Sequence, residues 1–498
     1  MAAKDVVLQV SSLVTESMNE KLRKIYRDEI TEFGNRPTIY RVSHDVRVDD
    51  TGAYEPKIIS IGPYHHGLET LQPMEAIKWE YLHDLLARNQ GSQNDKLRKY
   101  SDVVSACEPN LRSRYSDIID LSPEKFVELL ILDGCFIIEF LLKREEGKQQ
   151  KENRGKSNSG ISEKRNLPLL RHDLLLLENQ VPFSVLEKIS DEMGLGELYV
   201  LDLIIDFLTK GKMSKEEILS ADDVVTVEKP IQHILHVYHL CLLQGIKQKA
   251  NTPKISPGEV CLVKIKSAIS RIFIGILYFL VSIFQTLILR RPICLTDRNR
   301  LKSIKSTMRI IPSATELEES GVSFIRNLDV TGTCFYMNVS FNGGDFWMPY
   351  LSLENFVNSE FRNLLAFEQT YPHSGSNFTS YVTLMCNILD SAGDVAILRR
   401  ARILENNYGS DKEVAQMFNS LRSVTNLSVK KPHYLSGEFE KLNRYCESDR
   451  HRWRAALVND YFSSPWTIIS FSAAVFLIGL TCLQTIYAIL TYYLQPNT

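Results

Sequence analysis

The chain has 498 residues, of which 44% are hydrophobic and 24% are charged, and its formal net charge is −2 at pH 7. This length is enough for one large or two medium globular cores, and the charged fraction argues against general disorder. A nearly neutral charge gives no electrostatic basis for nucleic-acid binding, which normally needs a basic face. We therefore expect no nucleic-acid partner.

The nine cysteines are scattered along the chain, and none forms a C-x-x-C pair. Several lie in apolar runs, as Cys135 does, so buried free thiols in a reducing compartment are favoured over disulfides. The N-terminus lacks an apolar stretch with the strength of a secretory signal.

The N-terminal part predicts helices that are interrupted by a turn-rich block. Residues 1–35 have the pattern of one or two amphipathic helices that end at Gly34. Residues 39–67 combine turn formers with short extended pieces, and their prolines exclude a continuous helix. A helix resumes after Pro73. Its apolar stripe consists of Ile77, Tyr81, Leu82 and Leu85.

The next part predicts two core helices around a polar insertion. Residues 122–124 (Ser-Pro-Glu) combine a capping hydroxyl, a proline at the first helical position and an acid in the first turn. The helix that follows, residues 126–144, is apolar nearly all round and should be buried. Residues 144–166 have almost no aliphatic side chains and predict a disordered surface insertion. The apolar density of residues 167–189 then predicts a central helix.

Residues 231–243 predict another helix, and residues 272–289 are apolar and uncharged. The length of this apolar segment is at the lower limit for a membrane span, and basic residues flank both of its sides. We favour a buried helix, or a surface that rests against a bilayer, over a membrane crossing.

Strands are expected only beyond Pro312. Residues 334–339 and 346–351 flank Asn342-Gly343-Gly344-Asp345, which is typical of a β-hairpin. Further on, Ser410 and Glu413 form a capping box ahead of a helix. Its buried face should consist of Val414, Met417, Phe418 and Leu421.

The C-terminal segment, residues 461–498, carries no charged side chain. Residues 466–494 are strongly apolar and long enough to cross a hydrocarbon core of about 30 Å. Aromatic residues lie towards both ends, and several arginines precede the segment, which favours a cytosolic body. We expect one C-terminal transmembrane helix that binds membrane lipid in the plasma membrane or an endomembrane.

Two histidine groups could in principle bind a metal. The pair His65 and His66, with His44 nearby, would share one metal only at a sharp bend, so hydrogen bonds to turn carbonyls are favoured. His233, His236 and His239 are spaced by three on a predicted helix, which allows a two-histidine site. A packed or solvated helix face is the favoured interpretation.

Four acids lie in apolar surroundings and could act as a general acid and base. They are Asp133, Glu139, Asp173 and Glu178. Such groups are more often satisfied by partners within the core, and Lys78 and Asn179 are available. The sequence contains no phosphate-binding glycine loop, no G-x-S-x-G, no H-E-x-x-H and no EF-hand loop. We therefore assign no catalytic, cofactor-binding or metal-binding residue and expect no cofactor.

Several long segments resemble the plant family called domain of unknown function 247. They occur in order through almost the whole chain. The segments are residues 53–67, 132–141, 173–183, 311–324, 363–369 and the run from 460 into the last apolar helix. The resemblance implies a mostly helical fold with one terminal span and no established enzymatic activity or cofactor. It also implies an association of some members with self-recognition between pollen and pistil.

We therefore expect a mainly α-helical protein with a small β-hairpin element. It should comprise an N-terminal helical segment (1–35), a globular body (36–460) and a C-terminal membrane anchor (461–498). The favoured function is a non-enzymatic recognition or signalling component that binds protein partners. The alternative is a hydrolase or transferase that uses the buried carboxylates or histidines.

Overall fold

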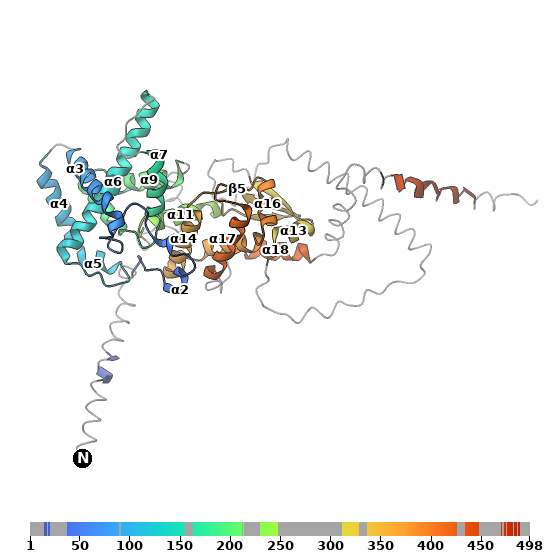
Figure 1. Cartoon of the computed structure of the whole chain (residues 1–498), viewed down its shortest axis with the longest axis horizontal. Coiled ribbons are helices and arrows are strands. Elements are labelled where there is room, and N and C mark those ends of the chain that lie inside the picture. Colours follow the sequence, from blue (N-terminus) through green and yellow to red (C-terminus); the bar gives the residue numbers. More distant parts are fainter. Residues whose placement is uncertain are drawn as a thin grey trace, which may run out of the picture.

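The computed structural model describes residues 37–88, 91–154, 163–211, 213, 230–247, 311–327, 336–425 and 434–447, with short helical pieces inside 14–19 and 470–488. The described body is mainly helical, as predicted (Figure 1). The apolar segment 272–289 and most of the predicted N-terminal helices lie outside the described residues. The division into segments 1–35, 36–460 and 461–498 stays a prediction.

The first half of the body is built around one long buried helix, α6. The helices of this half are α2 (His44–Arg47), α3 (Gln72–Ala87), α4 (Gln93–Ser105), α5 (Glu108–Ser113), α6 (Pro123–Arg154), α7 (Glu163–Leu174), α8 (Phe183–Glu192), α9 (Glu197–Thr209) and α11 (Ile234–Lys247), with 3-10 turns η1 (Thr51–Tyr54) and η2 (Glu69–Leu71). Helix α6 begins at the predicted proline and packs against α3, α4, α8 and α9. Gly134 allows α8 to approach closely, because a Cβ there would lie 2.9 Å from Ile189 Cδ1.

The second half combines helices with two small sheets. Its helices are α13 (Ala314–Glu319), α14 (Val357–Thr370), α15 (Asn377–Ile388), α16 (Ala392–Arg400), α17 (Asp411–Thr425) and α18 (Ser436–Cys446), with the 3-10 turn η4 (Pro372–Ser374). The strands are β1 (Ser323–Asn327), β2 (Ser340–Asn342), β3 (Asp345–Pro349), β4 (Leu351–Leu353) and β5 (Leu404–Asn406). Strand β3 pairs in parallel with β1 and antiparallel with β2, while β4 and β5 form a separate parallel pair.

The predicted hairpin is confirmed, but its first strand was placed too early. Residues 336–339 are not a strand, and β2 begins at Ser340. The turn is formed by Gly343 and Gly344, which both have positive φ, as a type I′ hairpin turn requires. The predicted capping box is also confirmed, because Ser410 N donates to Glu413 Oε2 and Glu413 N donates to Ser410 Oγ.

The predicted disordered insertion at 144–166 is wrong for most of its length. Residues 144–154 continue α6, whose end projects from the body in Figure 1, and residues 163–166 belong to α7. Three of the charged side chains that suggested disorder have partners elsewhere in the first half of the body. Arg144 and Lys148 both donate to Asp206 of α9, and Glu146 accepts from Arg88.

The predicted central helix over 167–189 is two helices with an irregular segment between them. Helix α7 ends at Leu174, and α8 begins at Phe183. Gln180 Nε2 donates to the Leu174 carbonyl oxygen at 2.8 Å, and Asn179 Nδ2 donates to the Asp173 carbonyl oxygen at 2.9 Å. These amides satisfy carbonyls that a continuing helix would have used, so the helix ends here.

The two halves share one hydrophobic core, which runs through α6, α8, α11, α14, α15 and α17. Helices from early in the chain and from late in the chain meet at α11 and α14 (Figure 1). All five described cysteines are free thiols, and three of them are buried.

Within the described residues, no single helix is both long and apolar enough to cross a membrane. Helices α15 and α16 meet those criteria only as a pair bent by 106°, and the apolar helices at Ile234–Gln244 and Phe476–Thr485 are shorter.

The segment of residues 37–67 is irregular apart from the short helix α2 and the 3-10 turn η1. The only regular strand pairing within it is an isolated bridge between Ile39 and Tyr115. At its end Gly62 has φ +75°, and a Cβ at this position would overlap the carbonyl oxygen of Gln180.

Gly62→Ala should therefore lower the free energy of unfolding by more than about 2 kcal/mol, because it adds a backbone clash to the strain of positive φ. Gly67→Ala is the matched control, because Gly67 has φ +84° with no atom within 4 Å of the added Cβ. We expect it to cost about 1 kcal/mol from strain alone. Urea unfolding of both variants measures the difference, and equal losses would contradict the role of the close approach.

Candidate functional site

The four buried acids of the sequence analysis all hold other parts of the chain in place. Asp173 accepts hydrogen bonds from the backbone N–H groups of Lys57, Ile58 and Ile59, at 2.8 to 2.9 Å. The neighbouring Asn179 accepts from Ile61 N at 2.7 Å. A carboxylate that accepts three backbone donors works as a backbone clamp, and its lone pairs are largely occupied.

Asp133 of α6 binds the backbone a few residues further along the segment 37–67. It accepts from Gly62 N at 2.7 Å and from Lys78 Nζ at 2.6 Å. Lys78 is fully buried and also donates to the Ser60 carbonyl oxygen and to Glu75. Burial lowers the pKa of Lys78, but contact with Asp133 and Glu75 outweighs this and raises it overall. The predicted partnership of a core acid with Lys78 is thus confirmed, and Lys78 is a charged structural group.

Glu178 and Glu139 are paired with arginines. Glu178 accepts from Val42 N at 2.7 Å and from Arg47 at 2.6 Å. Glu139 receives two hydrogen bonds from the guanidinium of Arg88. The four acids lie at separate positions in the core, and none is paired with a second acid as a catalytic dyad would be.

The histidines with i, i+3 spacing are buried around one phenylalanine ring. The rings of His233, His236 and His239 lie 5.2 to 5.4 Å from the ring of Phe367, by centroid distance. His233 Nδ1 accepts from His236 N, so its Nε2 carries the proton and donates to the Thr38 carbonyl oxygen.

Burial lowers the pKa of His233 to about 3, so this ring stays neutral. His239 instead pairs with Glu368 at 2.8 Å. These histidines form a packed helix face, and within the described residues no group of three or more His, Cys, Asp or Glu side chains is placed to hold a metal ion.

The second histidine group is spread over different surroundings. His65 is buried with its Nε2 3.8 Å from Glu178 Oε2, whereas His66 and His44 are exposed. Burial lowers the pKa of His65, against the opposing charge of Glu178. The structure does not bring the three rings together.

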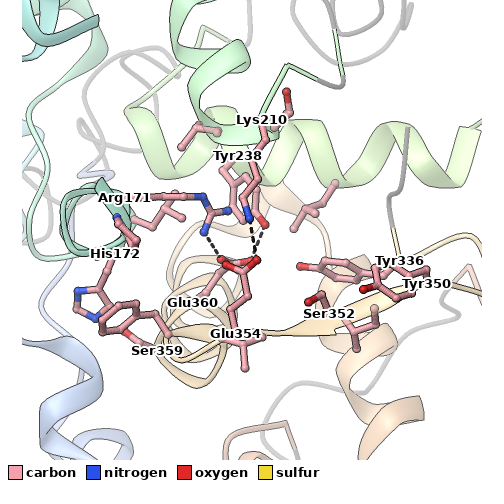
Figure 2. Close-up of a pocket in the computed structure, with 18 residues that line it drawn as sticks. Arg171, His172, Lys210, Tyr238, Tyr336, Tyr350, Ser352, Glu354, Ser359 and Glu360 are labelled. Atoms are coloured by element: carbon pink, nitrogen blue, oxygen red, sulfur yellow. Dashed lines mark hydrogen bonds and ion pairs between the residues drawn. The ribbon is translucent and has the colours of Figure 1, made fainter. Parts of the chain in front are cut away.

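The structure does contain a polar pocket that the sequence analysis missed. It lies where α7, α9 and α11 of the first half face β4 and α14 of the second, and its volume is about 180 Å³. Figure 2 shows Arg171 and Tyr238 directed at the carboxylate of Glu360. Arg171 Nη1 donates to Glu360 Oε2 at 2.7 Å, and the Tyr238 hydroxyl donates to Glu360 Oε1.

A second ion pair lies at the solvent side of this junction pocket. Lys210 Nζ lies 2.7 Å from Glu354 Oε1, and both side chains are more than half exposed. The opposite wall carries Tyr336, Tyr350 and Ser352 (Figure 2). Burial raises the pKa of Tyr238 far above its usual range, so this phenol stays protonated and donates to Glu360.

A signal for this pocket was present in the sequence. Arg171 is a charged residue inside an apolar run, and Glu360 lies among the apolar residues of another helix. The sequence analysis weighed acids in the apolar runs of the first half and considered neither residue. Their pairing across 189 positions could not be inferred from spacing.

The fold and these sites define a helical protein whose buried charges mostly hold its own backbone. The chain belongs to the DUF247 family, described as plant protein of unknown function, whose sequence profile matches residues 39–480. It is 29% identical over 460 residues to the UPF0481 protein At3g47200 of Arabidopsis thaliana, which covers 91% of this chain and 86% of the relative. A second Arabidopsis thaliana protein of the UPF0481 group, At3g02645, is 25% identical over 528 aligned positions, covering 97% and 95%. No solved structure matches.

The buried pair of Lys78 and Asp133 allows a test of its structural role. Lys78→Met should destabilise the protein by about 3–5 kcal/mol, because it leaves a carboxylate buried without its counter-charge. The double variant Lys78→Met with Asp133→Asn should be more stable than Lys78→Met alone. The reason is that the amide still accepts from Gly62 N and no charge is left unpaired.

The measurement is urea unfolding of Lys78→Met, of Asp133→Asn and of the double variant. Additive losses in the double variant would contradict the coupling of these side chains.

Proposed function

We propose that this chain is a non-catalytic interaction component that is held at a membrane by its C-terminal segment, with its helical body in the cytosol. The observation that supports a binding role over catalysis is the use of the buried acids. Asp173, Asp133 and Glu178 each accept backbone N–H groups of residues 42–62. A general acid or base needs a lone pair or proton directed at a substrate, and these carboxylates are directed at the chain itself.

The histidines support the same proposal. His233 uses both ring nitrogens in contacts with the chain, and His239 is paired with the buried Glu368. A hydrolase or transferase that uses these carboxylates or histidines would need to break core contacts in every cycle, so we do not favour that alternative.

The C-terminal helical pieces support the membrane proposal. Their large apolar side chains are exposed, with Phe476, Leu477, Ile478, Leu483 and Tyr487 between 61% and 74% accessible. Large contiguous apolar surfaces of this kind mark contact with a membrane or a partner. Together with the absence of charge over residues 461–498, this favours insertion into a bilayer.

The shared core supports a one-sided topology for the body. Contacts join residues before the apolar segment 272–289 to residues after it. Arg171 pairs with Glu360, His239 with Glu368, and Leu177 N with Asn363 Oδ1. Residues on both sides of the segment therefore belong in one compartment, which a single crossing within residues 248–310 would prevent.

Deletion of residues 466–498 should release the protein from membranes, because it removes the uncharged apolar segment that the proposal inserts into the bilayer. Full-length protein should stay in the membrane pellet in carbonate or high salt, since apolar burial does not depend on ionic strength. Fractionation and immunoblotting measure this. Full-length protein that washes off in salt would contradict an inserted anchor, and truncated protein that still pellets would locate the attachment in the body.

The topology predicts the glycosylation state. Acceptor patterns begin at Asn338, Asn377 and Asn426, and the proposal keeps all three unmodified in the cytosol. A polar tail with an acceptor site, added after Thr498, should instead be glycosylated, because the anchor places it in the lumen. Gel mobility before and after endoglycosidase measures both.

A shift of the untagged protein that disappears when all three asparagines are changed to Gln would overturn the cytosolic body. The acceptor pattern at Asn377 tests the topology least directly, because the Thr379 hydroxyl is buried and donates to Glu368.

A further inference from the structure

The junction pocket has the size of a small ring. Its volume of about 180 Å³ is below the roughly 300–1,000 Å³ of pockets for drug-sized ligands. An engineered cavity of about 150 Å³ is known to hold benzene. The space therefore suits one six-membered ring with a small substituent.

The walls of the pocket offer ring surfaces on several sides. Tyr238, Tyr336, Tyr350 and Phe356 line it from α11, from the segments beside β2 and β4, and from the turn before α14. Aromatic rings favour edge-to-face or offset contacts with another ring, so an aromatic ligand fits these walls better than an aliphatic one of equal volume.

Three pocket-lining residues carry buried polar atoms without hydrogen-bond partners in the described part of the chain. They are Arg171 Nε, which is a donor, His172 Nε2 and the Tyr336 hydroxyl. The His172 side chain is 2% exposed, and its Nδ1 lies 2.8 Å from the Asp173 carboxylate. With the proton on Nδ1, the neutral ring presents a free lone pair at Nε2. Buried polar atoms are normally paired, so these three point to a missing partner.

The charges of the pocket already cancel. Arg171 is paired with Glu360, and Lys210 with Glu354. A charged ligand would compete for one member of these pairs and leave the other uncompensated. A neutral ligand would leave the pair of Arg171 and Glu360 intact, and it would need to displace only the exposed pair of Lys210 and Glu354, which contributes little.

We propose that the junction pocket binds a small, neutral, single-ring aromatic compound whose substituent accepts a hydrogen bond from Arg171. An aryl amide or a phenol has this chemistry, and an amide can also donate to His172 Nε2. The proposal does not depend on the proposed membrane-held interaction role. The two proposals can fail separately, because the pocket is tested by ligand binding and the membrane role by fractionation and glycosylation.

The test uses the full chain in detergent and benzamide as the probe, with benzoate and benzylamine as charged analogues of equal size. Ligand-observed NMR titration should show saturable binding of benzamide and at least tenfold weaker binding of both charged analogues. Ser352→Phe should abolish benzamide binding, because Ser352 lines the pocket and a phenyl ring would fill it (Figure 2). Ser105→Phe, at the exposed end of α4, is the matched control and should bind as the wild type does.

Arg171→Lys provides a second variant if Ser352→Phe does not fold. It keeps a positive charge for Glu360 but removes Nε, so benzamide should bind at least fivefold more weakly. The proposal is overturned if benzamide does not bind the folded wild type or if the charged analogues bind equally well. It is also overturned if Arg171→Lys or a folded Ser352→Phe binds as tightly as the wild type.

Discussion

The structure depends on how the backbone of residues 37–67 is hydrogen-bonded. Outside α2 and η1 this segment is irregular, and apart from the bridge between Ile39 and Tyr115 no strand pairs with its N–H groups. Buried backbone donors without partners are costly, so side chains must replace the missing ladder. Glu178, Asp173, Asn179 and Asp133 do so in order along the chain, from Val42 to Gly62. Each of these side chains is buried next to a backbone N–H group of the segment, from which it accepts a hydrogen bond.

The second half of the body is attached to the same segment. Asn363 donates to the carbonyl oxygen of Ala53 at 2.9 Å and accepts from Leu177 N at 2.9 Å. Glu368 accepts from Phe378 N and Thr379 N at the start of α15, and it also pairs with His239. One helix, α14, therefore connects the segment of residues 37–67, the irregular turn after α7 and the start of α15. This linkage explains why helices that are distant in sequence form one core.

Much of the fold could be predicted from local patterns, because caps, proline positions and glycine turns act over a few residues. The start of α6, the capping box of α17 and the Gly343-Gly344 turn are examples. The break between α7 and α8 could not be predicted in this way. Its apolar density is typical of a helix, and the competing bonds come from Asn179 and Gln180, whose partners are set by the tertiary fold. The helical end of α6 was missed for a similar reason, because its charges are stabilised by Asp206 and Arg88 on other helices.

For the candidate site residues too, local sequence patterns predicted only part of what the structure shows. The four acids and the histidines of α11 are buried, whereas His44 and His66 are exposed. Burial alone does not distinguish a clamp from a catalyst. The partner atoms make that distinction, and here most of them are backbone atoms of the chain. The segments that resemble the family, among them residues 53–67, 132–141, 173–183 and 363–369, supply these clamps.

The principal polar residues of the junction pocket lie outside those segments. Arg171, Lys210, Tyr238, Glu354 and Glu360 are all placed between or beyond them. In this chain, the segments that carry the resemblance therefore supply the clamps that hold the body together. The clamps position the two halves of the body, and the pocket lies between these halves, with its principal polar side chains supplied by residues that form no clamp.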